Sequence, residues 1–62
     1  MKKVKTRIRM LRKLLGENQQ TFAQRLGVSF VTVNRWERGK TQPSRLALEK
    51  IEQVEKTHEA RT

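Results

Sequence analysis

Three glycines mark the expected ends of the first three helices of the chain. Gly16, Gly27 and Gly39 each follow a stretch whose apolar residues repeat at helical spacing. Glycine readily adopts the left-handed backbone that commonly ends a helix, so each is expected to stop the helix before it. The spacing predicts helices over 6–15, 19–26 and 30–38, and a fourth that extends toward His58.

The residues in front of three of these helices are good helix caps. Asn18, Ser29 and Ser44 each carry a side-chain oxygen that can accept a free N–H of the first helical turn. The predicted inward faces are Ile8, Leu11 and Leu15; Phe22, Ala23 and Leu26; Val33 and Trp36; and Ala47, Leu48, Ile51 and Val54. These signals predict an all-α fold. We expect one domain over 1–62, with a basic arm over 1–5, a folded core over 6–55 and a frayed tail over 56–62.

Composition restricts the chemistry that the chain can perform. The sequence has 62 residues, 34% of them hydrophobic, which suffices for one small core. It has no cysteine and a single histidine, His58, so we expect no disulfide and no metal site. No cofactor is expected either. No apolar run approaches the ~20 residues of a membrane span, and Met1-Lys2-Lys3 is not followed by the apolar region of a secretory signal peptide.

Positive charge is concentrated toward the N-terminus. The formal net charge is +9, and residues 1–16 contain no acid but seven basic residues: Lys2, Lys3, Lys5, Arg7, Arg9, Arg12 and Lys13. Residues 46–62 carry three basic and four acidic residues, for a net charge of −1. A concentrated positive field favours a polyanion, either nucleic acid or an acidic membrane surface. A solvated basic surface with no such partner is the alternative.

Residues 19–38 have the spacing of two helices that cross through a tight turn. Ala23 is small where the helices touch, and Gly27 stands where the turn becomes left-handed. Val28 is the apolar residue of the turn, and Val33 and Trp36 anchor the second helix so that its other face points outward. This arrangement predicts a helix-turn-helix.

The sequence resembles the Cro/C1-type, or Xre-like, helix-turn-helix family over roughly residues 7–54. The matching segments are Ile8, Leu11-Arg12 and Gly16, Asn18-Gln19, Leu26-Gly27-Val28-Ser29, Trp36-Glu37-Arg38-Gly39-Lys40 and Pro43-Ser44. The resemblance implies a compact lambda-repressor-like domain of four to five helices that binds DNA. Phe30 and Val31 depart from it, since the family often has polar base-reading residues there. Arg45 stands where members often have an apolar residue.

The predicted outward face of the 30–38 helix suits the edges of bases. Arg35 can bond O6 and N7 of guanine, and Asn34 can bond N6 and N7 of adenine. Phe30 and Val31 can contact thymine methyl groups. The resemblance also implies that these positions read bases. The alternatives are a solvated surface for Asn34 and Arg35, and a Phe30 that folds back or contacts a partner.

A second group of residues is predicted to bind phosphates. The resemblance implies a phosphate role for Gln19, which begins a helix where anions are favoured; simple capping is the alternative. Backbone contacts beside the 30–38 helix are expected from Thr32, Arg38, Lys40 and Thr41. Lys2, Lys3 and Lys5 are either an arm on the DNA or a disordered tail.

Two further sets of residues have expected roles away from DNA. The resemblance implies a structural ion pair between Arg12 and Glu37. Met10, Leu14 and Leu46 lie off the predicted stripes, so they are either a partner surface or scattered exposed apolar residues.

We therefore expect a transcriptional repressor that binds double-stranded DNA sequence-specifically and forms a homodimer on DNA. We expect it to be prokaryotic or phage-encoded, cytoplasmic and associated with the nucleoid. A small DNA-binding adaptor, antitoxin-like, that recruits or neutralises a protein partner is the alternative. A basic peptide on an anionic membrane would show broad apolar faces and no capped turns, and the three caps argue against it. We do not expect an enzyme, because no paired carboxylates, cysteine nucleophile or glycine-rich phosphate loop is present.

Overall fold

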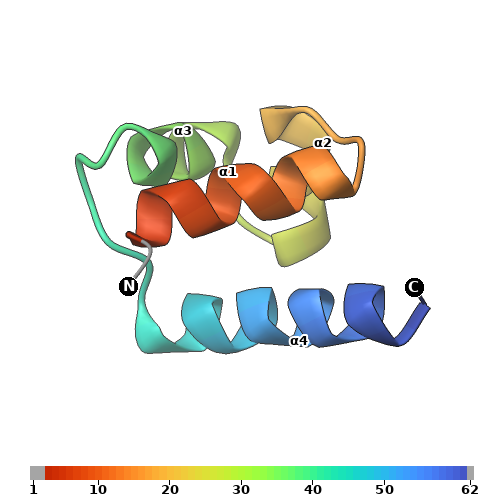
Figure 1. Ribbon diagram of the computed structural model, residues 1–62. Coiled ribbons are helices and arrows are strands. Elements are labelled where there is room, and N and C mark those ends of the chain that lie inside the picture. Colours follow the sequence, from red (N-terminus) through yellow and green to blue (C-terminus); the bar gives the residue numbers. More distant parts are fainter. Residues whose placement is uncertain (1–2, 62) are drawn as a thin grey trace.

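The computed structural model describes residues 3–61 and consists of four helices in that range. These are α1 (Val4–Leu14), α2 (Gln19–Leu26), α3 (Phe30–Glu37) and α4 (Arg45–Arg61). α2 packs against α3, α1 packs against α3, and α4 packs against α2. α4 runs along the side of the molecule opposite α3 (Figure 1). The all-α prediction is confirmed, with four helices in the described range.

α1 begins two residues earlier than predicted, at Val4 instead of Thr6. Val4 packs against the core and thereby continues the stripe of Ile8 and Leu11 at helical spacing. Lys5 is consequently part of a helix, and the prediction of a loose arm that includes this residue is wrong. Met1 and Lys2, the first two residues of the predicted arm, lie outside the described residues.

α3 ends one residue earlier than predicted, whereas α4 extends further than predicted. α3 ends at Glu37, and Arg38 is its C-cap. α4 continues to Arg61, so the tail that we expected to fray is helical over residues 56–61. Val54 and His58 are partly buried and give this last part of the helix a packed face, and no glycine or proline interrupts it. Thr62 lies outside the described residues.

The predicted caps of α2, α3 and α4 are present. The Asn18 side chain accepts from the Thr21 N–H at 2.8 Å, and Ser44 Oγ accepts from the Ala47 N–H at 3.2 Å. Ser29 Oγ accepts from the Thr32 N–H at 3.1 Å. Each bond satisfies a backbone donor that has no partner within the helix. The start of the helix-turn-helix is therefore fixed locally by its own sequence.

The turn between α2 and α3 is closed from two sides. Gly27 has a φ of 72°, the left-handed conformation that its position requires. The Lys50 ammonium of α4 donates to the carbonyl of Leu26 at 3.3 Å, which gives a partner to an acceptor at the end of α2. Val28 packs against the core, as predicted.

One apolar core lies between the helices. Its buried residues are Ile8, Leu11, Phe22, Ala23, Leu26, Val33, Trp36, Ala47 and Ile51, with Val4, Leu15, Val28 and Val54 packed against it. Met10, Leu14 and Leu46 are exposed, in agreement with their positions off the stripes. Ala23 of α2 is 2% exposed within this core, so a larger side chain there would strain the packing around it.

Across residues 3–61, no helix is long and apolar enough to cross a membrane. Within the same range, no group of His, Cys, Asp and Glu side chains is arranged to hold a metal ion.

Candidate nucleic-acid interface

α3 has a buried face and an outer face that follow directly from its sequence. Val33 and Trp36 are buried, and they hold the helix against the core although its β-branched residues are poor helix formers. On the outer face, Phe30 is 49% and Val31 52% exposed. Two large apolar side chains at the start of a helix therefore face outward, where they are available to a partner.

The polar residues predicted on this face differ in their exposure and in their contacts within the protein. Arg35 and Arg38 are exposed, and neither forms an ion pair within the part of the chain that the structure describes. Asn34 is half-buried at the edge of the face, and its Nδ2 donates to Oε1 of Gln19 at 3.1 Å. Phe30, Val31 and Arg35 are thus exposed to solvent, whereas Asn34 is hydrogen-bonded to α2.

Apart from Gln19 of α2, the residues predicted to bind phosphates lie in the first turn of α3, at its C-cap or in the loop that follows it. Thr32 belongs to the first turn, and its hydroxyl lies 2.8 Å from Ser29 Oγ. Lys40 and Thr41 are exposed in the loop that follows the helix. Lys5 of α1 lies beside this loop: a Cβ built on Gly39 would stand 3.4 Å from Lys5 Cδ. The start of α1 therefore adds a basic residue to the surface beside the end of α3.

Arg12 of α1 and Glu37 of α3 form the ion pair that the resemblance implies. Arg12 donates to the two carboxylate oxygens of Glu37 at 2.7 and 2.9 Å, and the Glu37 side chain is only 2% exposed. Burial raises the pKa of the Glu37 carboxyl, but hydrogen bonds from Arg12 and Gln19, with the charges of Arg12 and Arg9, lower it further than burial raises it. The net pKa of Glu37 is below its ordinary value of 4.5, so the carboxyl is ionised at neutral pH.

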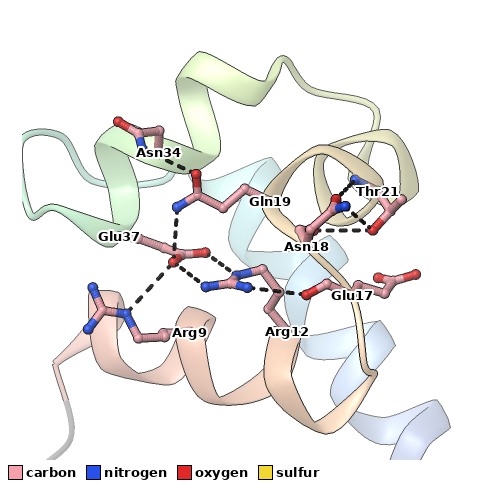
Figure 2. Close-up of polar contacts among 8 residues, drawn as sticks. All are labelled: Arg9, Arg12, Glu17, Asn18, Gln19, Thr21, Asn34 and Glu37. Atoms are coloured by element: carbon pink, nitrogen blue, oxygen red, sulfur yellow. Dashed lines mark hydrogen bonds and ion pairs between the residues drawn. The ribbon is translucent and has the colours of Figure 1, made fainter.

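Two further contacts of this carboxylate have no counterpart in the sequence pattern (Figure 2). Arg9 Nε lies 3.8 Å from Glu37 Oε1, and its side chain remains 55% exposed. Gln19 Nε2 donates to the same oxygen at 3.2 Å. No local pattern indicates either contact, because both depend on how α1, α2 and α3 pack. Their presence makes Gln19 part of an internal network as well as the first residue of α2.

Arginines bind several of the acidic residues elsewhere in the molecule. Arg7 donates to both oxygens of Glu55 at 2.6 and 2.8 Å, and Arg25 to both oxygens of Glu17 at 2.7 and 3.0 Å. The salt bridges among residues 3–61 involve arginines and no lysine. The lysines near α3, Lys5 and Lys40, therefore have no carboxylate partner within that range.

The decisive observations are the tight α2–α3 turn, the small, buried Ala23 of α2 and the outward face of α3. A sequence profile described as helix-turn-helix matches residues 8–54, which is most of the chain. The chain belongs to the Cro/C1-type helix-turn-helix family. It is accordingly a DNA-binding helix-turn-helix regulator, and its partner is double-stranded DNA. Searches of curated proteins and of solved structures return no match to the chain.

Proposed function

We propose that this helix-turn-helix protein is a sequence-specific transcriptional repressor that inserts α3 into the major groove of DNA. The observation that carries the proposal is the division of α3 into a buried face with Val33 and Trp36 and an outer face with Phe30, Val31 and Arg35. A major groove about 12 Å wide admits a helix presented in this way. Repression follows from occupying a site that polymerase needs.

Base reading is assigned to the outer face of α3. Arg35 donates two hydrogen bonds to O6 and N7 of guanine, because its guanidinium has no competing carboxylate within the described part of the chain. Phe30 and Val31 contact thymine methyl groups with the exposed part of their side chains. Asn34 reads the neighbouring base from the edge of the face.

Phosphate contacts are assigned to residues that frame this face. Lys40 and Thr41 contact the backbone from the loop after α3, and Thr32 and Arg38 do so from the helix and its C-cap. At the other side, Gln19 is the first residue of α2, whose first turn contains no acidic residue. A phosphate is favoured there by the free N–H groups and the helix dipole.

The protein is proposed to be prokaryotic or phage-encoded and to act as a homodimer in the cytoplasm, associated with the nucleoid. Dimers of helix-turn-helix proteins bind half-sites roughly 34–36 Å apart, one turn of DNA. The operator is therefore expected to be a palindrome with this spacing.

Selection from a random duplex library at physiological salt tests the proposal. An enriched palindrome with half-sites one turn apart supports a dimeric regulator, and a reporter gene placed behind that sequence tests repression. Arg35→Ala is the test variant. Arg45→Ala is the matched control, because its side chain is 95% exposed on α4. Binding with no enriched sequence, lost as salt rises, would contradict the proposal.

An adaptor or antitoxin-like role is the second candidate. Met10 and Leu14 are exposed on α1 and, with Arg7, Glu55, His58 and Glu59, line an open cavity of about 300 Å³ beside α4. Apolar side chains of this kind suit a protein partner. Enrichment of a single half-site, together with stoichiometric co-purification of one protein that Leu14→Lys abolishes, would favour this role over the dimeric repressor.

A further inference from the structure

A continuous chain of side-chain hydrogen bonds leads from the buried carboxylate of Glu37 to the outer face of α3 (Figure 2). Gln19 Nε2 donates to Glu37 Oε1 at 3.2 Å, and Asn34 Nδ2 donates to Gln19 Oε1 at 3.1 Å. We call Glu37, Gln19 and Asn34 the amide relay. It joins α2 to α3 at two successive turns of α3, since Asn34 and Glu37 are three residues apart on the same side of the helix.

The direction of the amide relay is fixed at its buried end. An ionised carboxylate only accepts hydrogen bonds, whereas an amide side chain donates from nitrogen and accepts at oxygen. Gln19 must therefore turn its nitrogen toward Glu37, because the opposite orientation would bring two oxygens together. Once its nitrogen is used in this way, Gln19 presents its oxygen to Asn34. Asn34 must then turn its own nitrogen inward.

Arg12 maintains the charge that fixes this direction. Its guanidinium bonds both oxygens of Glu37, and the carboxyl stays ionised at neutral pH. A protonated carboxyl would gain a donor, and the direction would no longer be unique. The ion pair between α1 and α3 thus has a consequence beyond the stability of the fold.

The outer end of the relay is an oriented hydrogen-bond acceptor. With Nδ2 of Asn34 bonded to Gln19, the Asn34 amide oxygen points away from Gln19 (Figure 2). In the major groove, the base atoms that donate to such an oxygen are the exocyclic amino groups, N6 of adenine and N4 of cytosine. The remaining Nδ2 proton of Asn34 is still available, and beside adenine it can reach N7.

We propose that Glu37, acting through Gln19, is a positioning residue for base recognition, and that it holds Asn34 with its oxygen toward an exocyclic amino group of adenine or cytosine. The proposal rests on the proposed function, in which α3 enters the major groove. It adds the chemical class of the group that Asn34 reads. It also assigns a specificity role to two residues that need not touch a base.

NMR spectroscopy of the free protein tests the direction of the relay without DNA. One side-chain amide proton of Asn34 and one of Gln19 should exchange slowly with water, and the two amides should show mutual NOEs. Gln19→Leu removes the middle of the relay while leaving the two bonds from Arg12 to Glu37, and it should abolish the protection at Asn34. Gln24→Leu is the matched control, since Gln24 is exposed on α2. An unprotected Asn34 amide in the wild-type protein would overturn the assigned direction.

Binding to modified duplexes tests the base-reading step. Asn34→Ala first identifies the base pair whose preference depends on this residue. The amino group there is then removed, with purine replacing adenine or pyrimidin-2-one replacing cytosine, which also distinguishes the two bases. Wild-type affinity should fall about five- to a hundredfold, the range expected for a good base contact. Gln19→Leu should bind the two duplexes almost equally, whereas Gln24→Leu should retain the wild-type preference.

The remaining outcomes separate this proposal from the proposed function. Retained discrimination in Gln19→Leu, or a preference for guanine or thymine at the Asn34 position, would overturn the role of the relay while α3 remained the reading helix. Absence of any selective duplex binding would overturn the proposed function and the base-reading step together. In that case the NMR result would still decide the direction of the relay.

Discussion

The guanidinium of Arg12 in α1 bonds both carboxylate oxygens of Glu37 in α3, at 2.7 and 2.9 Å. This contact holds α1 against α3. Since Glu37 is buried, removal of Arg12 leaves its charge with only the Gln19 amide and the more distant, exposed Arg9 as partners.

Arg12→Ala should therefore destabilise the fold by about 3–5 kcal/mol, measured by urea denaturation at neutral pH. Arg25→Ala is the control: its ion pair with Glu17 is 44% exposed on the arginine side, and its loss should cost about 1 kcal/mol or less. Equal effects of the two substitutions would contradict the buried character of the Arg12–Glu37 pair. Loss of DNA binding by Arg12→Ala would not by itself show a DNA contact.

Stability should depend on pH through Glu37. Its pKa is lower in the folded protein than its ordinary value of 4.5, so the carboxyl contributes stability that is fully present above that value. The contribution is lost as the pH falls below about 4.5 toward the folded pKa. Denaturation from pH 7 to pH 3 measures the effect. In Glu37→Gln, which cannot ionise, the decline should be shallower over that window than in the wild-type protein.

Val33 and Val31 form a matched pair on opposite faces of α3. Val33 is fully buried, and Val33→Ala should lower the free energy of unfolding by about 2 kcal/mol through lost burial and a cavity. Val31 is 52% exposed, and Val31→Ala should change stability by about 0.5 kcal/mol or less. At a temperature at which both variants are folded, Val31→Ala should lower the affinity for DNA more than Val33→Ala does. An unaltered affinity in Val31→Ala would remove this residue from the reading face.

Arg35→Ala should relax the preference for guanine at one position of the operator. The expected loss at that position is about 1–3 kcal/mol, measured as the ratio of affinities for duplexes that differ only there. The substitution should change the affinity for a duplex that lacks this guanine less than the affinity for the duplex that contains it. Unchanged sequence selectivity would show that Arg35 does not read a base.

Lys40→Ala should weaken binding to all duplexes alike. A lysine on phosphate contributes mainly through counterion release, so the slope of log affinity against log salt should fall in magnitude by about one. Lys56→Ala on α4 is the control, because Lys56 is exposed on the helix opposite α3. A loss confined to certain sequences would mean that Lys40 contacts a base instead.

The features that the sequence predicted correctly are governed by neighbours along the chain. Asn18, Ser29 and Ser44 cap helices through backbone N–H groups three residues later, so composition and spacing suffice. Gly27 ends α2 for a reason confined to its own backbone conformation. The buried positions of α3 likewise follow from the period of the helix, which places Val33 and Trp36 on one side.

The features that the sequence did not predict depend on distant partners. Gln19 and Asn34 are 15 residues apart, and Arg7 and Glu55 are 48 residues apart, so no helical period connects them. The early start of α1 at Val4 and the late end of α4 also reflect packing against other helices, which outweighs local end signals. The position of Arg9 beside Glu37 also depends on how separate helices pack, so the sequence did not predict it.

The asymmetry of charge gives the molecule a direction. The four glutamates of α4 are balanced by four basic residues, and this helix lies opposite α3, while basic residues without an ion pair in the described range gather at the start of α1 and around the end of α3. In the field of a polyanion such a body experiences a torque as well as an attraction. We therefore expect the protein to approach DNA with α3 leading and α4 trailing while it is still diffusing, before any atom of the two molecules has met.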